Sequence, residues 1–84
     1  MRRNWRDILA EMLDYCLTPR RQTHIIYNTN ISKTIWDYVS DIALKAGLLF
    51  YDKEHYETTQ KGILYLAKWH DITVLTAPVM KESE

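Results

Sequence analysis

The chain has 84 residues, a length that suits one domain with a small core, and ten aromatic residues argue against intrinsic disorder. Eleven basic and eleven acidic residues give a net charge of zero, so the composition alone does not point to a nucleic-acid partner. The first 47 residues nevertheless carry a net charge of +2, with all the arginines, and the remainder carries −2.

The single cysteine and the hydropathy pattern favour a cytoplasmic, unexported protein. Cys16 has no partner in the chain, so no internal disulfide can form. Its place on the apolar side of the first expected helix favours plain packing over an intermolecular disulfide. No apolar run approaches membrane-spanning length and no signal-peptide core opens the chain. We therefore expect no membrane partner.

The first expected element is a helix that follows a basic lead over residues 1–4 and ends at Leu17. Asn4 and Asp7 fit the N-cap and third position of this helix. Its apolar side, expected to face the core, consists of Trp5, Ile8, Leu9, Met12, Leu13 and Cys16. A short second helix is expected to begin at Thr18-Pro19, a favoured helix opening, and to break at residues 28–30.

The third expected helix, residues 32–46, has both ends marked: Ser32 suits the N-cap and Gly47 suits the position that closes a helix. Its helical period predicts a core stripe of Ile35, Val39, Ile42 and Ala46, with Trp36 and Ala43 beside it. The opposite side carries Lys33, Thr34, Asp37, Tyr38, Asp41 and Lys45. A second helix of a helix-turn-helix motif uses such a displayed side to read a DNA groove.

After Gly47 the pattern changes to two short strands, residues 48–51 and 55–58, which flank a polar loop and predict a β-hairpin. A fourth helix is expected from Gln60 to about His70, capped by Thr59, and Gly62 inside it indicates a close packing approach. The core side of this helix is predicted to hold Ile63, Leu66, Ala67 and His70. Residues 71–84 form an apolar and then acidic tail, which either extends the helix or is irregular.

Three stretches in this order resemble small archaeal winged helix-turn-helix proteins. THIIYNTNIS (residues 23–32) is similar to their T-R-I-M-Y-x-A-N-L-S, LKAGLL (44–49) to L-x-x-G-L-L, and YETTQKG (56–62) to Y-x-L-T-x-K-G. The resemblance covers about residues 5–70. It implies one α+β winged-helix domain over residues 1–84, made of a three-helix bundle, a two-stranded β-hairpin wing and a C-terminal helix.

The resemblance also implies a DNA-binding transcriptional regulator or chromatin-type protein, usually a homodimer, whose helix 32–46 enters the major groove of double-stranded DNA. The candidate DNA-binding residues are Arg20, Arg21, Gln22, Lys33, Thr34, Asp37, Tyr38 and Lys53. The arginines at the expected start of the second helix suit phosphates. Asp37 either accepts from a cytosine amino group or is merely structural. Residues 2, 3 and 6 are arginines that either reach DNA or keep the N-terminus soluble.

Several alternatives remain open at this stage. Dimerisation is expected through the first helix, Trp69 and the apolar tail, unless Tyr15 and Trp69 simply complete the core. The acidic residues on helix 32–46 and in the hairpin loop favour a winged-helix protein-interaction module without direct DNA binding as the alternative function. A redox sensor that uses Cys16 is the third possible function, and the sequence favours it less than the other two. Without a zinc-ligand spacing, phosphate loop or nucleophile motif, we expect no metal, no cofactor and no enzyme.

Overall fold

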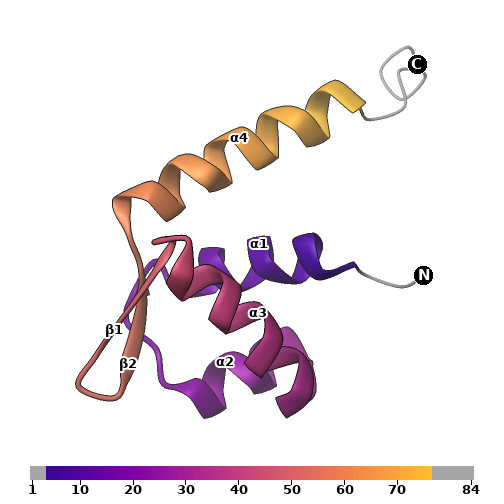
Figure 1. The fold of residues 1–84 in the computed structure, drawn as a ribbon. Helices are drawn as coiled ribbons and strands as arrows, with labels where there is room; N and C mark the ends of the chain where they lie inside the picture. The colour runs from indigo at the N-terminus through magenta and orange to yellow at the C-terminus, as the bar shows by residue number, and fades with distance from the viewer. Residues whose placement is uncertain (1–3, 77–84) are drawn as a thin grey trace.

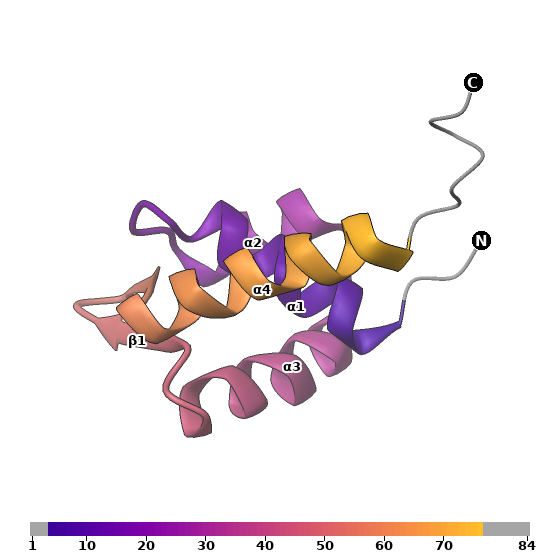
Figure 2. The same cartoon turned by 90° about the horizontal axis from the view of Figure 1, so that it is seen from above.

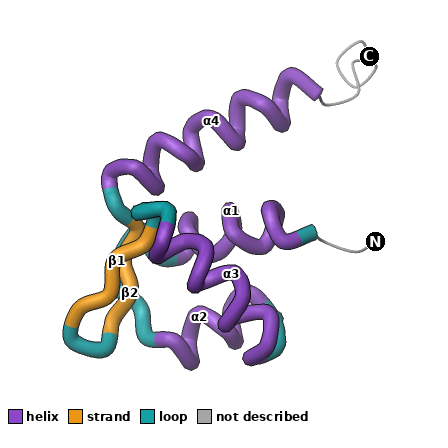
Figure 3. Tube along the Cα trace, in the orientation of Figure 1, coloured by secondary structure: helices purple, strands orange, loops and turns teal. Residues whose placement is uncertain are grey.

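The computed structural model describes residues 4–76, with side-chain surroundings through His70. Three helices, α1 (Trp5–Tyr15), α2 (Gln22–Thr29) and α3 (Lys33–Lys45), form a bundle (Figure 1). A hairpin of β1 (Leu49–Asp52) and β2 (His55–Thr58) projects from one end of it (Figure 3). The last helix, α4 (Gln60–Thr76), runs along α1, with α2 and α3 on opposite sides (Figure 2). This is the expected α+β winged helix-turn-helix architecture.

The first helix matches its sequence pattern closely. The Asn4 side chain accepts from the backbone N–H of Asp7 at 2.9 Å, and the Asp7 carboxylate accepts from the N–H of Asn4, which completes a capping box. The predicted core side is buried except at Trp5, which lies at the edge. The helix ends at Tyr15, two residues before the predicted end.

The predicted start of the second helix at Thr18-Pro19 is wrong, because α2 begins at Gln22. The chain between α1 and α2 is extended at Arg20, whose N–H donates to the carbonyl of Tyr56 at 3.0 Å and whose carbonyl accepts from the Tyr56 N–H at 2.7 Å. Pairing with β2 thus supplies the backbone hydrogen bonds that a helical turn would have made. This tertiary pairing overrides the local helix signal.

The turn between α2 and α3 has the helix-ending and helix-capping residues that the sequence predicts. Asn30 closes α2 in the left-handed conformation, with a φ of 56°. Ser32 caps α3, because its hydroxyl accepts from the backbone N–H of Ile35 at 3.2 Å. At the other end of α3, Gly47 has a φ of 78° and the N–H of Leu48 reaches back to the carbonyl of Ala43, a Schellman closure.

The core side of α3 is rotated relative to the prediction. Its buried residues are Trp36, Val39, Ser40 and Ala43, whereas Ile35 and Ala46 from the predicted stripe are exposed. The indole of Trp36 packs edge-on against the ring of Tyr56, with 5.0 Å between ring centroids. Burial of this large ring between α3 and the hairpin sets the rotation of the helix. The expectation that Trp36 belongs to the core is confirmed.

The hairpin is joined by a two-residue turn. Tyr51 pairs with Tyr56 in its antiparallel register, and both rings lie on the side that faces the start of α2. Lys53 and Glu54 form the turn with φ of 48° and 67°, the left-handed pair of a type I′ turn. The other side of the hairpin carries Phe50, Asp52, His55 and Glu57.

The last helix differs from its prediction in orientation. It continues beyond His70 to Thr76, so up to that residue the tail extends the helix, which was one of the two expectations. A methyl group at Gly62 would collide with the carbonyl oxygen of Leu48 and the methyl group of Thr58, so the predicted close approach is confirmed. This contact turns the other side of the helix outward, and three residues predicted to face the core are exposed: Ile63, Ala67 and His70. Leu66 is buried as predicted.

Some predictions concern residues that lie outside the described part. Arg2 and Arg3 of the basic lead and the tail from residue 77 onward are among them. Within residues 4–76, no helix is both long enough and apolar enough to cross a membrane.

Candidate nucleic-acid interface

Three elements carry the sequence-predicted DNA-binding residues, and we use the term reading face for them together: the outward side of α3, the start of α2 and the turn of the hairpin. It contains the following sequence-predicted residues: Arg21, Gln22, Lys33, Thr34, Asp37, Tyr38 and Lys53. The eighth predicted residue, Arg20, points elsewhere. Trp36 and Tyr56 link α3 to the hairpin beneath this face, so the third helix and the hairpin turn are held in fixed relative positions.

Both lysines on α3 are neutralised by a carboxylate one turn away. Lys33 Nζ lies 3.2 Å from the carboxylate of Asp37, and Lys45 Nζ lies 3.2 Å from that of Asp41. All four side chains are more than half exposed. Solvated pairs of this kind contribute at most about 1 kcal/mol each, so a ligand can open them at little cost.

Tyr38 extends the reading face toward the start of α1. Its side chain is 57% exposed, and its ring meets the ring of Trp5 edge-on at 6.4 Å between centroids. The guanidinium of Arg6 lies 5.3 Å from the centroid of the Trp5 ring. Thr34 is exposed on the same helix side, one turn before Tyr38. Arg6 therefore supplies a cation at the α1 end of this face.

Arg20 serves the fold rather than the reading face in this structure. Its Nε donates to the carbonyl oxygen of Tyr15 at 3.0 Å, and its guanidinium stacks 4.1 Å from the centroid of the Tyr15 ring. The predicted phosphate contact of Arg20 stays a prediction, and it would require the guanidinium to leave Tyr15. The sequence offered no signal for this contact, because it depends on the extended pairing of Arg20 with β2.

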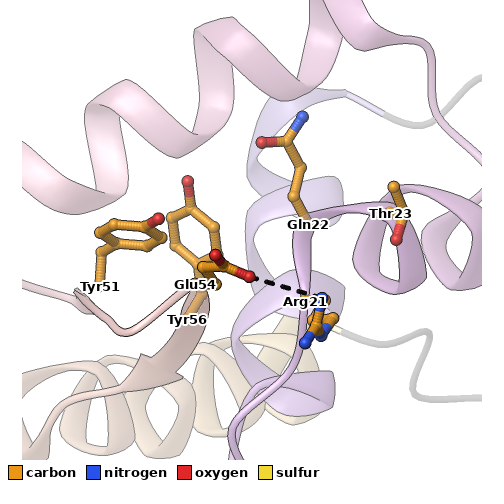
Figure 4. Close-up of a pocket in the computed structure, with 6 residues that line it drawn as sticks. All are labelled: Arg21, Gln22, Thr23, Tyr51, Glu54 and Tyr56. Atoms are coloured by element: carbon orange, nitrogen blue, oxygen red, sulfur yellow. Dashed lines mark ion pairs between the residues drawn. The ribbon is translucent and has the colours of Figure 1, made fainter.

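Arg21 lies at the junction of α2 and the hairpin. Its guanidinium is 3.5 Å from the carboxylate of Glu54 across a cavity of about 310 Å³ (Figure 4). The cavity is lined by Arg21, Gln22, Thr23, Tyr51, Glu54 and Tyr56. Arg21 is also the N-cap residue of α2, and it makes no capping hydrogen bond with its side chain.

Lys53 at the tip of the hairpin is the most prominent cation of the wing. It is exposed and forms no ion pair with any residue between 4 and 70. Its backbone carbonyl lies 2.9 Å from Nδ1 of His55. The lysine side chain is thus free to meet an external anion.

Two groups near this surface have raised pKa values. Burial, and secondarily the neighbouring Tyr51, raises the pKa of the Tyr56 phenol, which therefore remains a hydrogen-bond donor at neutral pH. Burial raises the pKa of the Cys16 thiol to about 12, although Arg20 opposes the shift. Cys16 is fully buried and stays protonated at neutral pH, so it acts as a packing group.

Elsewhere in the described part of the chain, no cluster of three or more histidine, cysteine, aspartate or glutamate side chains is arranged to hold a metal ion. Tyr15 and Trp69, both considered for a dimer interface, pack as partly buried residues against the core.

The order of helices, the left-handed turn after α2, the exposed third helix and the adjoining hairpin together define a winged helix-turn-helix protein. Comparison with known families agrees: a winged helix-turn-helix family matches residues 2–76. The chain belongs to this family. A search of curated proteins found no match.

Proposed function

We propose that this protein is a transcriptional regulator that binds double-stranded DNA as a homodimer, with α3 in the major groove. The observation that carries the proposal is the reading face itself. The second helix of the helix-turn-helix displays Lys33, Thr34 and Asp37 on its first two turns, which are the turns that reach base edges in this class of motif. Arg21 at the N-cap of α2 and Lys53 in the hairpin turn supply further cations.

The proposed contacts divide into two kinds. Arg21 and Lys53 bind phosphates, and they position the protein without reading sequence. Lys33, Thr34 and Asp37 meet base edges, where lysine donates to guanine and aspartate accepts from the amino group of cytosine.

The outward side of α4 supports the homodimer. Ile63 is 43% exposed, Leu64 is 57% exposed, and Ala67 is exposed beside them. An apolar strip of this kind on a 17-residue helix suits a second copy of the same helix. The predicted interface of the first helix, Trp69 and the apolar tail stays a prediction, and α4 adds this strip to it. Such a regulator acts inside the cell, where its DNA is.

Titration of labelled duplex DNA, followed by fluorescence anisotropy, tests the proposal. We expect binding that weakens as salt increases, because phosphate contacts release counterions. Arg21→Ala should weaken binding to all sequences alike, whereas Thr34→Ala should change the preferred base at one position. Lys68→Ala is the matched control, since it removes an exposed cation on α4, away from the reading face. Unchanged affinity in both reading-face variants contradicts this face.

A second candidate function is a winged-helix module that binds protein and not DNA. The observation that favours it is the ion pairing of the reading face, where Asp37, Asp41 and Glu54 each neutralise a cation. Absence of DNA binding at low salt and tens of micromolar protein would favour this second function over the first.

A further inference from the structure

We propose that Glu54 acts as an internal stand-in for a DNA phosphate, so that the wing holds Arg21 in a closed state that DNA has to displace. The inference rests on the proposed function and concerns how its phosphate contact is regulated. It depends on three independent features of the junction between α2 and the hairpin.

The first feature is the cationic start of α2. Arg21 is its N-cap residue, and a guanidinium has no acceptor, so the first backbone amides at the positive end of the helix dipole receive no cap from this side chain. The Arg21 guanidinium lies at the same place and is more than half exposed. Amides and guanidinium together suit a phosphate oxygen.

The second feature is that a carboxylate of the same chain already occupies this position. Glu54 approaches Arg21 to 3.5 Å from the opposite wall of the cavity (Figure 4). The Arg20–Tyr56 backbone bridge joins the segment before α2 to β2 two residues from the turn, which brings the turn within reach of Arg21. Arg21 therefore cannot bind a phosphate fully until Glu54 moves away.

The third feature is the backbone conformation that presents Glu54. Both turn residues are left-handed without being glycine or asparagine, with φ of 48° at Lys53 and 67° at Glu54. For such residues this conformation costs roughly 1–2 kcal/mol each. Asn-Gly is the usual choice for this turn. A glutamate kept at the glycine position, and facing an arginine, indicates a role beyond the turn itself.

The cavity beside the Arg21–Glu54 pair offers further donors to a phosphodiester once Glu54 has moved. Tyr51 and Tyr56 stand side by side along it, 4.7 Å apart between ring centroids, and both carry a phenol that can donate a hydrogen bond (Figure 4). With Glu54 in place, the site contains one cation and one anion and attracts phosphate weakly. Loss of the carboxylate charge leaves the arginine, the amides and the phenols for the DNA backbone.

Glu54→Gln tests the inference, because it removes the charge and keeps the side-chain shape. We expect its dissociation constant for duplex DNA at low salt to fall about three- to tenfold, and the salt dependence to steepen by about one phosphate contact. Glu57→Gln is the matched control: it changes the net charge equally, in the same hairpin, on the side away from Arg21. It should change affinity far less. In the Arg21→Ala background, Glu54→Gln should bring no comparable gain.

The possible outcomes separate the inference from the function on which it rests. Equal gains in Glu54→Gln and Glu57→Gln would mean that only net charge matters, and would overturn the inference while DNA binding stands. Binding by Glu54→Gln where the wild type binds poorly would support both. If neither protein binds DNA although both show the same thermal unfolding, both the proposed function and the inference are wrong.

Discussion

Gly62 is the residue on which the placement of α4 depends. Alanine in the middle of a helix is favoured over glycine by about 1 kcal/mol. At this position its methyl group would collide with the Leu48 carbonyl and the Thr58 methyl group, and neither is the free end of a flexible chain. We therefore expect Gly62→Ala to lower the free energy of unfolding by about 1–3 kcal/mol, as overpacked sites do.

Urea denaturation measures this effect. Lys68→Gly, at an exposed position of the same helix outside the apolar strip, is the control, and it should lose only the propensity difference of about 1 kcal/mol. A Gly62→Ala variant at least as stable as the wild type would contradict the close contact.

At the scale of residues, the sequence identified the caps of α1, α3 and α4 correctly, placed the start of α2 wrongly at Thr18, and missed several side-chain partners. Ser32, Asn4 and Gly47 act through neighbours a few positions away, so local pattern is enough to predict them. The contacts of Arg20 with Tyr15 and of Arg21 with Glu54 depend on where the hairpin lies against α2. No spacing rule in the sequence contains that information.

The wing turn is the element whose stability can most readily be improved. Asparagine tolerates the left-handed conformation better than lysine, and it is favoured at the first position of a type I′ turn. We expect Lys53→Asn to raise the free energy of unfolding by about 0.5–1 kcal/mol without disturbing the Arg21–Glu54 pair. Thermal unfolding followed by circular dichroism measures the change.

The control for Lys53→Asn is Lys68→Asn in α4. The same substitution in an exposed helical position should be neutral or destabilising by a few tenths of a kcal/mol, because asparagine is the weaker helix former. A destabilised Lys53→Asn variant would show that the lysine contributes more to the turn than its backbone strain costs.

At the scale of elements, the prediction gave the order and type of the helices and strands correctly, but it turned the wrong side of two helices toward the core. The helix-turn-helix, the hairpin and the cap of α4 follow from local signals, and all are confirmed. Helical periodicity placed Ile35 and Ile63 toward the core, but both are exposed. In each helix one contact across the fold sets the rotation: Trp36 against Tyr56, and Gly62 against Leu48.

For the whole molecule, the exposed strip of α4 predicts the oligomeric state. Replacing Ile63 and Leu64 together by lysine should convert a homodimer into monomers, because the added charges cannot be buried between two copies. Sedimentation velocity measures this, and Lys61→Ala with Lys68→Ala is the control that leaves the apolar strip intact. A monomeric wild type at 100 µM protein, on the order of the concentrations at which weak dimers form, contradicts the interface.

Charge shows most clearly what the sequence could and could not say about the whole molecule. The net charge of zero can be counted from the sequence, but the positions of the charges in space cannot be read from it. The structure places three cation–carboxylate pairs of the described residues on one face, at Arg21, Lys33 and Lys45. Cations that count separately in a sequence are thus partly neutralised where they would meet DNA, and phosphate contacts should be few.

The edge-on packing of Trp36 against Tyr56, with Tyr56 also paired to Arg20, ties the wing to α3 and to the segment before α2. If DNA binds as proposed, we expect the span from α3 to the hairpin tip to change little on binding. The protein would then select DNA partly by groove width, because a duplex of the wrong width has to bend or twist to fit and bears that elastic cost itself.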